Sequence, residues 1–265
     1  MSTFEHDGWR LSYQDRGHGS VILLIHSLLF DHTVLEPQVS ALEDRFRLIT
    51  PDLRGHGASE HRPEERTLWD LMEDQIALLD HLGIKRAVWG GASVAGPIAL
   101  RAALRHPERV SALVLISTQA GPEHPARKPG YEAFAGLVAT EGWTEQALMG
   151  MARTNFGPGA PAAVVDSWTE RWRSSPTNDI GQVMRALTRR ESLLDRLTEI
   201  EVPALIVYGE DDRVALDPEE VEALVAGLTN IVEFVRIPDA GHTVTLEKPA
   251  AVNEALSRFL NHVMK

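Results

Sequence analysis

Short apolar runs alternate with helical patterns along most of the chain, and this alternation strongly limits the folds open to it. Each run has the length of one strand and is apolar on both faces, as residues 21–25 illustrate. Such strands are typical of parallel sheets, and parallel strands need a crossover between them. The sequence therefore predicts an α/β fold with a mostly parallel central sheet and helices on both faces. The predicted strands cover residues 9–13, 21–25, 46–50, 110–116, 204–208 and 231–237, and another begins at Ala87.

Several predicted helices carry recognisable start signals. Thr67, with Asp70 three positions later, has the pattern of a capping box, and Gly83 ends the apolar periodicity that follows. Asp217 and Pro218 open a later helix as its N-cap and first helical residue. The helices therefore fall between predicted strands, as the crossovers of a parallel sheet require.

The alternation stops between residues 121 and 199. This stretch contains amphipathic helical patches and no clear buried strand. We therefore expect residues 121–199 to form an inserted helical cap on an α/β core made of residues 1–120 and 200–265. Three tryptophans of the cap could line a pocket or simply pack the cap onto the core, and aromatic burial of the second kind is ordinary. They are Trp143, Trp168 and Trp172.

Composition and charge exclude several classes of function. The 265 residues, of which 43% are hydrophobic and 24% charged, suit one soluble globular domain. Because the chain has no cysteine, it has no disulfide framework, thiolate metal site or cysteine nucleophile. The net charge of −12 repels nucleic-acid backbones and anionic membrane surfaces, so we expect neither as a partner.

The N-terminal residues show no basic segment followed by an apolar core, which a secretory signal peptide would need. No apolar run approaches the length of a membrane span. We therefore expect a cytoplasmic protein.

Ser93 stands where the apolar run beginning at Ala87 meets a helix-compatible, alanine-rich segment. Residues 91–95 (GASVA) are a variant of the nucleophile elbow G-x-S-x-G, with Gly96 one place after the usual last glycine. In such a turn the serine oxygen is exposed above the sheet, and the N–H of the next residue, here Val94, points at the same spot. A tight turn with an incidental serine would have the same pattern, so the assignment depends on a base and an acid elsewhere.

His242 is the best candidate base, because it follows the last predicted strand at the edge where the loops of an α/β sheet converge. His56 is the second candidate, but it lies between two glycines, where a role in a turn is favoured. The candidate acids are Glu210, Asp211 and Asp212, which follow the strand ending at residue 208. Successive residues point in different directions, so at most one of the three should reach the imidazole.

Several separated motifs resemble the α/β-hydrolase fold superfamily over nearly the whole chain. The order serine, acid, histidine along the sequence is the order found in that superfamily. The superfamily acts on its substrates through a triad that needs no organic cofactor and no metal, so none is implied here. The motifs are residues 26–28 (HSL), residues 52–59 (DLRGHGAS), the Ser93 elbow, residues 209–212 (GEDD), and residues 241–242 (GH) followed by residues 247–249 (EKP).

The resemblance also implies individual roles. Asp212 would be the acid, since the acid usually stands three residues after the glycine that ends the strand. Ser93 would be the nucleophile, His242 the base, and the backbone N–H groups of Leu28 and Val94 the oxyanion hole. The chain departs from the usual pattern at residue 27, where serine replaces glycine, and at residue 95, where alanine replaces the last glycine of the elbow.

Within the superfamily, residues 26–28, 37–42 and 52–59 look like those of 3-oxoadipate enol-lactonases and neighbouring small esterases. The resemblance therefore implies a serine hydrolase that cleaves a small carboxylic ester or lactone through an acyl-enzyme. A carbon–carbon bond hydrolase with the same triad remains an alternative. A slow-hydrolysing small-ligand receptor or stress regulator is a second alternative, because residues 93–95 also resemble the elbow of such proteins.

Haloalkane dehalogenases and epoxide hydrolases would place aspartate where Ser93 stands, which disfavours both classes. The expected partner is a small-molecule ester or lactone, and the sequence does not indicate an oligomeric state.

Overall fold

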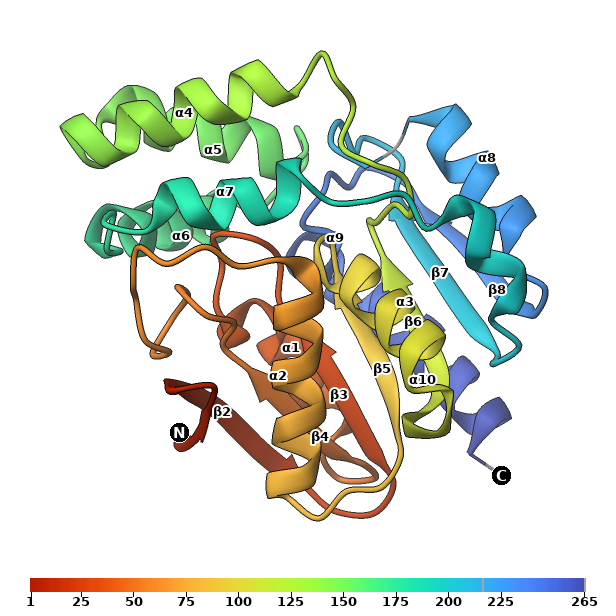
Figure 1. Ribbon diagram of the computed structural model, residues 1–265. Coiled ribbons are helices and arrows are strands. Elements are labelled where there is room, and N and C mark those ends of the chain that lie inside the picture. The colour runs from red at the N-terminus through yellow and green to blue at the C-terminus, as the bar shows by residue number, and fades with distance from the viewer. Residues whose placement is uncertain (216, 265) are drawn as a thin grey trace.

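An eight-stranded sheet forms the centre of the computed structural model, which describes residues 1–215 and 217–264 (Figure 1). The strand order is β1-β2-β4-β3-β5-β6-β7-β8. β2 pairs antiparallel with β1 and β4, and the other neighbours pair in parallel, which confirms the predicted mostly parallel sheet. The strands are β1 (Ser2–His6), β2 (Trp9–Gly17), β3 (Val21–Ile25), β4 (Arg47–Pro51), β5 (Ala87–Ala92), β6 (Val110–Ile116), β7 (Ala204–Gly209) and β8 (Ile231–Ile237).

β1 is the strand that our sequence analysis did not predict. It forms a hairpin with β2 through Asp7 and Gly8, which both have positive φ angles of 49° and 76°. Aspartate followed by glycine is a strong signal for a two-residue hairpin turn, so the hairpin of β1 and β2 could have been predicted from the sequence.

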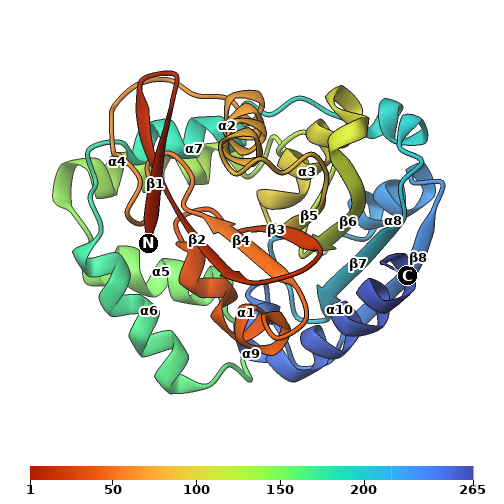
Figure 2. The same ribbon diagram turned by 90° about the horizontal axis from the view of Figure 1, so that it is seen from below.

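Helices cover both faces of the sheet, because alternate residues of each buried strand point to opposite sides (Figure 2). In β3, Leu23 and Ile25 pack in the core that includes α2 and α3, whereas Ile22 and Leu24 pack in the core that includes α1 and α10. The core helices are η1 (His32–Leu35), α1 (Glu36–Leu42), α2 (Leu68–His81), α3 (Ala95–Arg105), η2 (Pro107–Arg109), η3 (Leu194–Glu199), α8 (Pro218–Gly227), α9 (Val244–Glu247) and α10 (Pro249–Val263).

The predicted helix starts are confirmed at α2 and α8. Thr67 accepts a hydrogen bond from the N–H of Asp70, and the Asp70 carboxylate accepts one from the N–H of Thr67 at 2.7 Å. Asp217 caps α8 by accepting from the N–H of Glu219 at 3.1 Å. None of the helices within the described ranges combines the length and the apolar character that crossing a bilayer requires.

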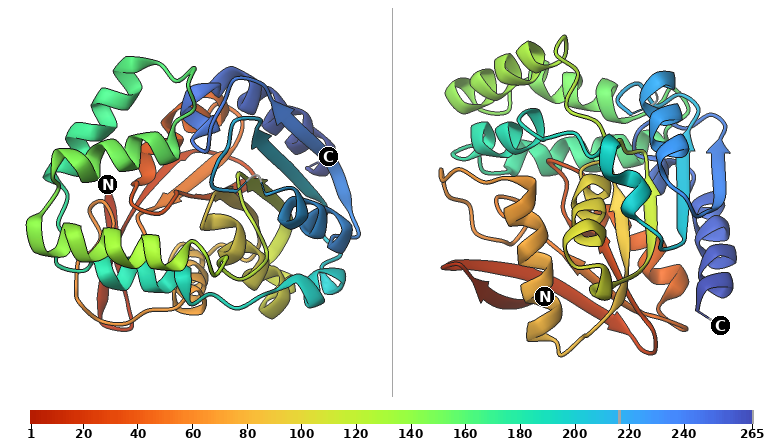
Figure 3. Two further views of the ribbon diagram at one scale, coloured as in Figure 1. Left: turned by 90° about the horizontal axis from the view of Figure 1, so that it is seen from above. Right: turned by 45° about the vertical axis from the view of Figure 1, so that its right-hand side comes forward.

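The four α-helices between β6 and β7 form a layer over the carboxyl ends of the parallel strands (Figure 3). This layer contacts the core directly, since Nε1 of the buried Trp172 donates to the carbonyl of Leu29, just after β3, at 2.8 Å. The division into a cap of residues 121–199 and a core stays a proposal. Within that range, η3 packs against the core helices α3 and α8. The helices of the layer are α4 (Lys128–Glu141), α5 (Glu145–Asn155), α6 (Ala162–Ser174) and α7 (Ile180–Thr188).

Candidate active site

Ser93 occupies a strained turn between β5 and α3. Its φ is 58°, in the left-handed region, and its N–H donates to the carbonyl of Ile116 on β6 at 2.9 Å. Close backbone approach explains the glycines around it. A Cβ on Gly91 would lie 1.9 Å from the carbonyl oxygen of Ile25, and one on Gly96 would lie 2.1 Å from Oγ1 of Thr118. The turn is therefore built by close packing of β5 and α3 on β3 and the loop after β6.

The two backbone groups predicted for an oxyanion hole lie on neighbouring segments. Val94 is the N-cap residue of α3, so its N–H lies at the positive end of the helix dipole. Leu28 lies in the loop after β3, which is adjacent to β5 in the sheet. Leu29 turns the chain at that point with a φ of 62°.

Asp212 is the acid that contacts His242. Nδ1 of His242 lies 3.0 Å from Oδ2 and 3.1 Å from Oδ1 of Asp212, and both side chains are buried. Oδ1 also accepts from the N–H groups of Val214 and Ala215 at 2.8 and 2.9 Å. Asp211 and Glu210 are exposed at the surface. Of the three candidate acids, the structure therefore brings Asp212 to the imidazole.

The environment keeps the Asp212 carboxylate ionised. Burial raises the pKa of Asp212, but the neighbouring His242 ring and the N–H groups of Ala215 and Val214 together outweigh this effect. The pKa of Asp212 therefore lies below its usual value. Because a carboxylate only accepts hydrogen bonds, Nδ1 of His242 carries the proton, and Nε2 is left as the basic nitrogen.

The loop that carries His242 is held by both the core and the helical layer. Oε2 of the buried Glu247 accepts from the N–H groups of Gly241 and of Gly157, which follows α5, each at 3.0 Å. Thr243 donates from its N–H and its Oγ1 to the carbonyl of Asn155 at 2.9 and 2.8 Å. These contacts fix the backbone on both sides of His242.

Ser93 and His242 line the same small cavity, of about 30 Å³. Within the described residues no hydrogen bond joins their side chains, and the hydrogen bonds of the His242 ring are to Asp212. Further walls come from residues that our sequence analysis missed, among them Tyr131 of α4 and Arg190 after α7. Their positions depend on how the helical layer docks, and no local sequence signal reports that.

Arg190 is fully occupied by contacts inside the protein. Its Nε donates to the carbonyl of Gly121 at 2.9 Å, and its two terminal nitrogens donate to Glu123 at 2.6 Å and to Gln119 at 3.0 Å. Since the Glu123 carboxylate balances the charge of the guanidinium, this wall of the Ser93 cavity is polar and close to neutral.

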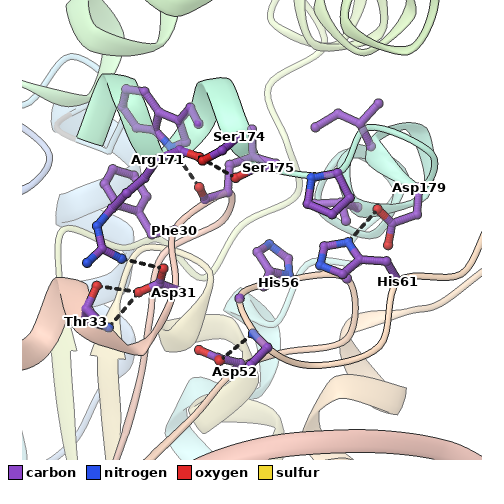
Figure 4. A pocket seen from close by; sticks show the side chains of 18 of the residues that line it. Phe30, Asp31, Thr33, Asp52, His56, His61, Arg171, Ser174, Ser175 and Asp179 are labelled. Carbon is purple, nitrogen blue, oxygen red and sulfur yellow. Dashed lines mark hydrogen bonds and ion pairs between the residues drawn. The ribbon is translucent and has the colours of Figure 1, made fainter. Parts of the chain in front are cut away.

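His56, the second candidate base, lies apart from Ser93. Its Nδ1 contacts the carbonyl of Arg54 at 3.0 Å, and a carbonyl only accepts, so Nδ1 carries the proton. Burial, with a contribution from nearby His26, lowers the pKa of His56 to about 3. His56 faces a different cavity, of about 370 Å³, between the helical layer and the loops after β3 and β4 (Figure 4). Trp143, Trp168 and Trp172 are buried and also line this larger cavity.

Within residues 1–215 and 217–264, no group of three or more histidine, aspartate or glutamate side chains has an arrangement that could hold a metal ion. At the elbow, His242 contacts Asp212 and lines one cavity with Ser93.

Comparison with known proteins agrees with this architecture. Residues 20–249 match the model of the alpha/beta hydrolase fold family. The chain is 30% identical to a thermophilic esterase from Thermogutta terrifontis, with a TM-score of 0.91 over 99% of this chain and 97% of that one. It is 28% identical to 3-oxoadipate enol-lactonase 1 of Acinetobacter baylyi, over 97% of this chain and 95% of the relative. It is 27% identical to a non-heme haloperoxidase of Rhodococcus erythropolis, over 96% of this chain and 97% of the relative.

The family match spans most of the sequence, from just before β3 to the first residue of α10. The resemblance drawn from the separated motifs is therefore confirmed, and the chain belongs to the alpha/beta hydrolase fold family.

Proposed function

We propose that this protein is a serine hydrolase that cleaves a small carboxylic ester or lactone, with Ser93 as nucleophile, His242 as base and Asp212 as the orienting acid. The observation that carries the proposal is the buried hydrogen bond between Asp212 and His242, on a histidine that shares a cavity with Ser93. The names of two similar proteins, an esterase and an enol-lactonase, support the same reaction class.

In the first half of the reaction, Nε2 of His242 removes the hydroxyl proton of Ser93 while Oγ attacks the carbonyl carbon of the substrate. Negative charge develops on the carbonyl oxygen, and the N–H groups of Val94 and Leu28 receive it. His242 then protonates the leaving alcohol oxygen as the tetrahedral intermediate collapses to an acyl-enzyme. Asp212 stabilises the imidazolium throughout and keeps the proton on Nδ1.

In the second half, His242 removes a proton from water, and the resulting hydroxide attacks the acyl carbon. Collapse of the second intermediate returns the proton to Oγ of Ser93 and releases a carboxylic acid. With a lactone, the alcohol and the acid stay in one molecule, so the product is a hydroxy acid.

The cavity at Ser93 favours a small, uncharged acyl group. Its volume of about 30 Å³ has room for only a few heavy atoms, and Arg190 is already neutralised by Glu123. We therefore expect acetyl and butyryl esters to react faster than octanoyl esters.

The test is multiple-turnover hydrolysis of p-nitrophenyl acetate, butyrate and octanoate and of γ-butyrolactone by the wild type and Ser93→Ala. We expect Ser93→Ala to lower turnover by at least about a thousandfold with the fold intact, in line with loss of a triad member. The matched control is Ser117→Ala, since Ser117 is a buried serine in the same cavity with no hydrogen-bond partner for its Oγ among the described residues.

The control variant should keep more than about a tenth of wild-type turnover, and an organophosphonate should label the wild type once, at Ser93. Equal losses in the two serine variants would contradict Ser93 as nucleophile. A single slow burst with every substrate would contradict a hydrolase and favour a small-ligand receptor.

A further inference from the structure

Arginines gather at a second cavity, which shares Arg190 as a lining residue with the Ser93 cavity. This cavity, of about 110 Å³, lies between the first turn of α2, the middle of α3 and the end of α7. Five arginines and two glutamates are among its lining residues, in a chain whose net charge is −12. The local excess of positive charge therefore contrasts with the protein as a whole.

Three of these arginines have acidic partners inside the protein. Arg66 pairs with Asp179 at 3.0 Å, Arg189 with Glu65 at 3.3 Å, and Arg190 with Glu123 at 2.6 Å. Their charges are therefore accounted for without a ligand.

Arg101 of α3 has no acidic partner among residues 1–215 and 217–264, although it is only 1% exposed. Its terminal nitrogens donate to the carbonyls of Pro97 and Glu191 at 3.1 and 3.3 Å, and its Nε donates to no described atom. Burial lowers the pKa of Arg101 to about 10, so the guanidinium is still charged near neutral pH.

A buried cation is costly unless an anion or a full set of hydrogen bonds compensates it. The Glu191 carboxylate is adjacent, but its Oε2 is bound to Nε1 of Trp69 at 2.8 Å and its side chain is exposed. Arg185, which also lines the cavity, bonds to the neutral side chain of Gln182 at 3.1 Å. Two arginines of the cavity, Arg101 and Arg185, therefore form no salt bridge with a carboxylate of the described chain.

The start of α2 adds a second feature that attracts negative charge. Residues 67–69, at the N-terminus of the 14-residue helix α2, line the cavity. The capping box occupies the N–H groups of Thr67 and Asp70, so those of Leu68 and Trp69 are the ones left for an anion. An arginine fork presents donors in the geometry that phosphate and carboxylate oxygens accept.

We propose that this cavity binds a small oxyanion, a phosphate or carboxylate group, between Arg101 and the N-terminus of α2. The volume is sufficient for one such group. The site is separate from Ser93 and does not depend on the reaction proposed above. It would join three segments that are distant in sequence, namely α2, α3 and the chain after α7.

The experiment is titration of the full chain with inorganic phosphate and, separately, acetate, with chloride at matched ionic strength as reference. Binding is followed by calorimetry and by the midpoint of thermal unfolding. We expect one of the two anions to bind saturably and to raise the midpoint above the chloride reference, and the one that does so identifies the group.

The variant Arg101→Gln should weaken binding of that anion at least about tenfold. Arg105→Gln is the matched control, because Arg105 lies one turn later on α3 and its guanidinium lies 4.1 Å from the centre of the Trp69 ring, over which Arg101 also lies, at 5.0 Å. It pairs with Glu73 and does not line the cavity, so this variant should bind as the wild type does.

Arg185→Gln, on the partly exposed face of α7, gives a second variant in case Arg101→Gln does not fold, and it should weaken binding several-fold. The proposal is overturned if neither anion exceeds chloride. It is also overturned if Arg105→Gln weakens binding as much as either cavity variant does.

Discussion

Two histidine loops at the same edge of the sheet resemble each other in sequence and differ in their chemistry. His242 and His56 each follow a glycine, and both are buried, with 3% and 4% of their surface exposed. Nδ1 of His242 donates to the carboxylate of Asp212, whereas Nδ1 of His56 donates to a backbone carbonyl. A carboxylate stabilises the imidazolium that forms when a base takes up a proton, and a neutral carbonyl does so far less.

Burial and position at the sheet edge are therefore not sufficient to make a histidine a base. A base also needs a suitable hydrogen-bond partner for its second ring nitrogen and a nucleophile in the same cavity. His242 has a carboxylate partner and shares its cavity with Ser93, the proposed nucleophile, while His56 faces a cavity whose lining residues do not include Ser93. Each of the following predictions tests one part of this difference.

The largest effect is expected from exchanging the two histidines for glutamine, one at a time. His242→Gln removes the proposed base and should lower kcat by about a millionfold, as loss of a triad histidine does. His56→Gln should lower kcat less than about tenfold. Steady-state hydrolysis of p-nitrophenyl acetate, with circular dichroism to verify folding, measures both. Comparable losses in the two variants would remove the distinction between the loops.

The next largest effect concerns the acid. Asp212→Asn keeps the shape of the side chain but removes the charge that stabilises the imidazolium, so kcat should fall up to about ten-thousandfold. Asp211→Asn is the matched control on the adjacent, exposed residue, and it should change kcat little. A large loss at Asp211 with near-normal activity at Asp212 would reverse the assignment.

A smaller effect should come from the carboxylates that hold the two loops. Glu247 accepts backbone N–H groups beside His242, and Asp52 accepts the N–H of Ala58 beside His56 at 2.9 Å. Replacing either by alanine leaves buried donors unpaired and should cost about 2 to 3 kcal/mol of unfolding free energy. Only Glu247→Ala should also lower kcat, by about tenfold, because it loosens the His242 loop.

Urea denaturation and kcat, measured for both alanine variants, decide this point. If Asp52→Ala lowered kcat as much as Glu247→Ala, the loop carrying His56 would also be supporting the reaction.

The smallest effect is a pH dependence of stability. A histidine in the unfolded chain titrates near 6.5, whereas the pKa of folded His56 is about 3. Between these values the unfolded state binds the additional proton, so stability falls as the pH falls. At pH 5 this linkage amounts to about 2 kcal/mol.

His56→Gln should remove that loss, and His18→Gln, at an exposed histidine, is the control. The free energy of unfolding at pH 7 and pH 5 is compared for the wild type and both variants. An unchanged pH dependence in His56→Gln would mean that His56 is protonated in the folded protein.

The residues that could be predicted from the sequence are those attached directly to strands. Ser93, Asp212 and His242 each follow a predicted strand closely, and the carboxyl ends of parallel strands converge on one edge. Local chemistry was therefore sufficient to nominate them. The choice of Asp212 over Asp211 needed the family resemblance, since adjacent residues differ only in direction.

Other parts of the site depend on contacts between distant segments. The loop that carries Leu28 follows β3, which pairs with β5, the strand before Ser93, although β4 stands between these two strands in the sequence. Tyr131 and Arg190 reach the Ser93 cavity through the docking of amphipathic helices. Periodicity gives the apolar face of such a helix but not the partner against which that face packs.

The helical layer is bonded to the core at several separate points, and this arrangement limits how a substrate can enter. Trp172 is bonded to the loop after β3, and Asn155 to the loop carrying His242. Arg190 is bonded to Gln119 after β6, and Asp179 to Arg66 just before α2. A lid hinged at one end could open as a rigid body, but a helical layer bonded to the core at several separate points cannot. Substrate must therefore reach Ser93 through local shifts of side chains and short segments. The rate at which substrate and product exchange with solvent is then set by the weakest of these attachments.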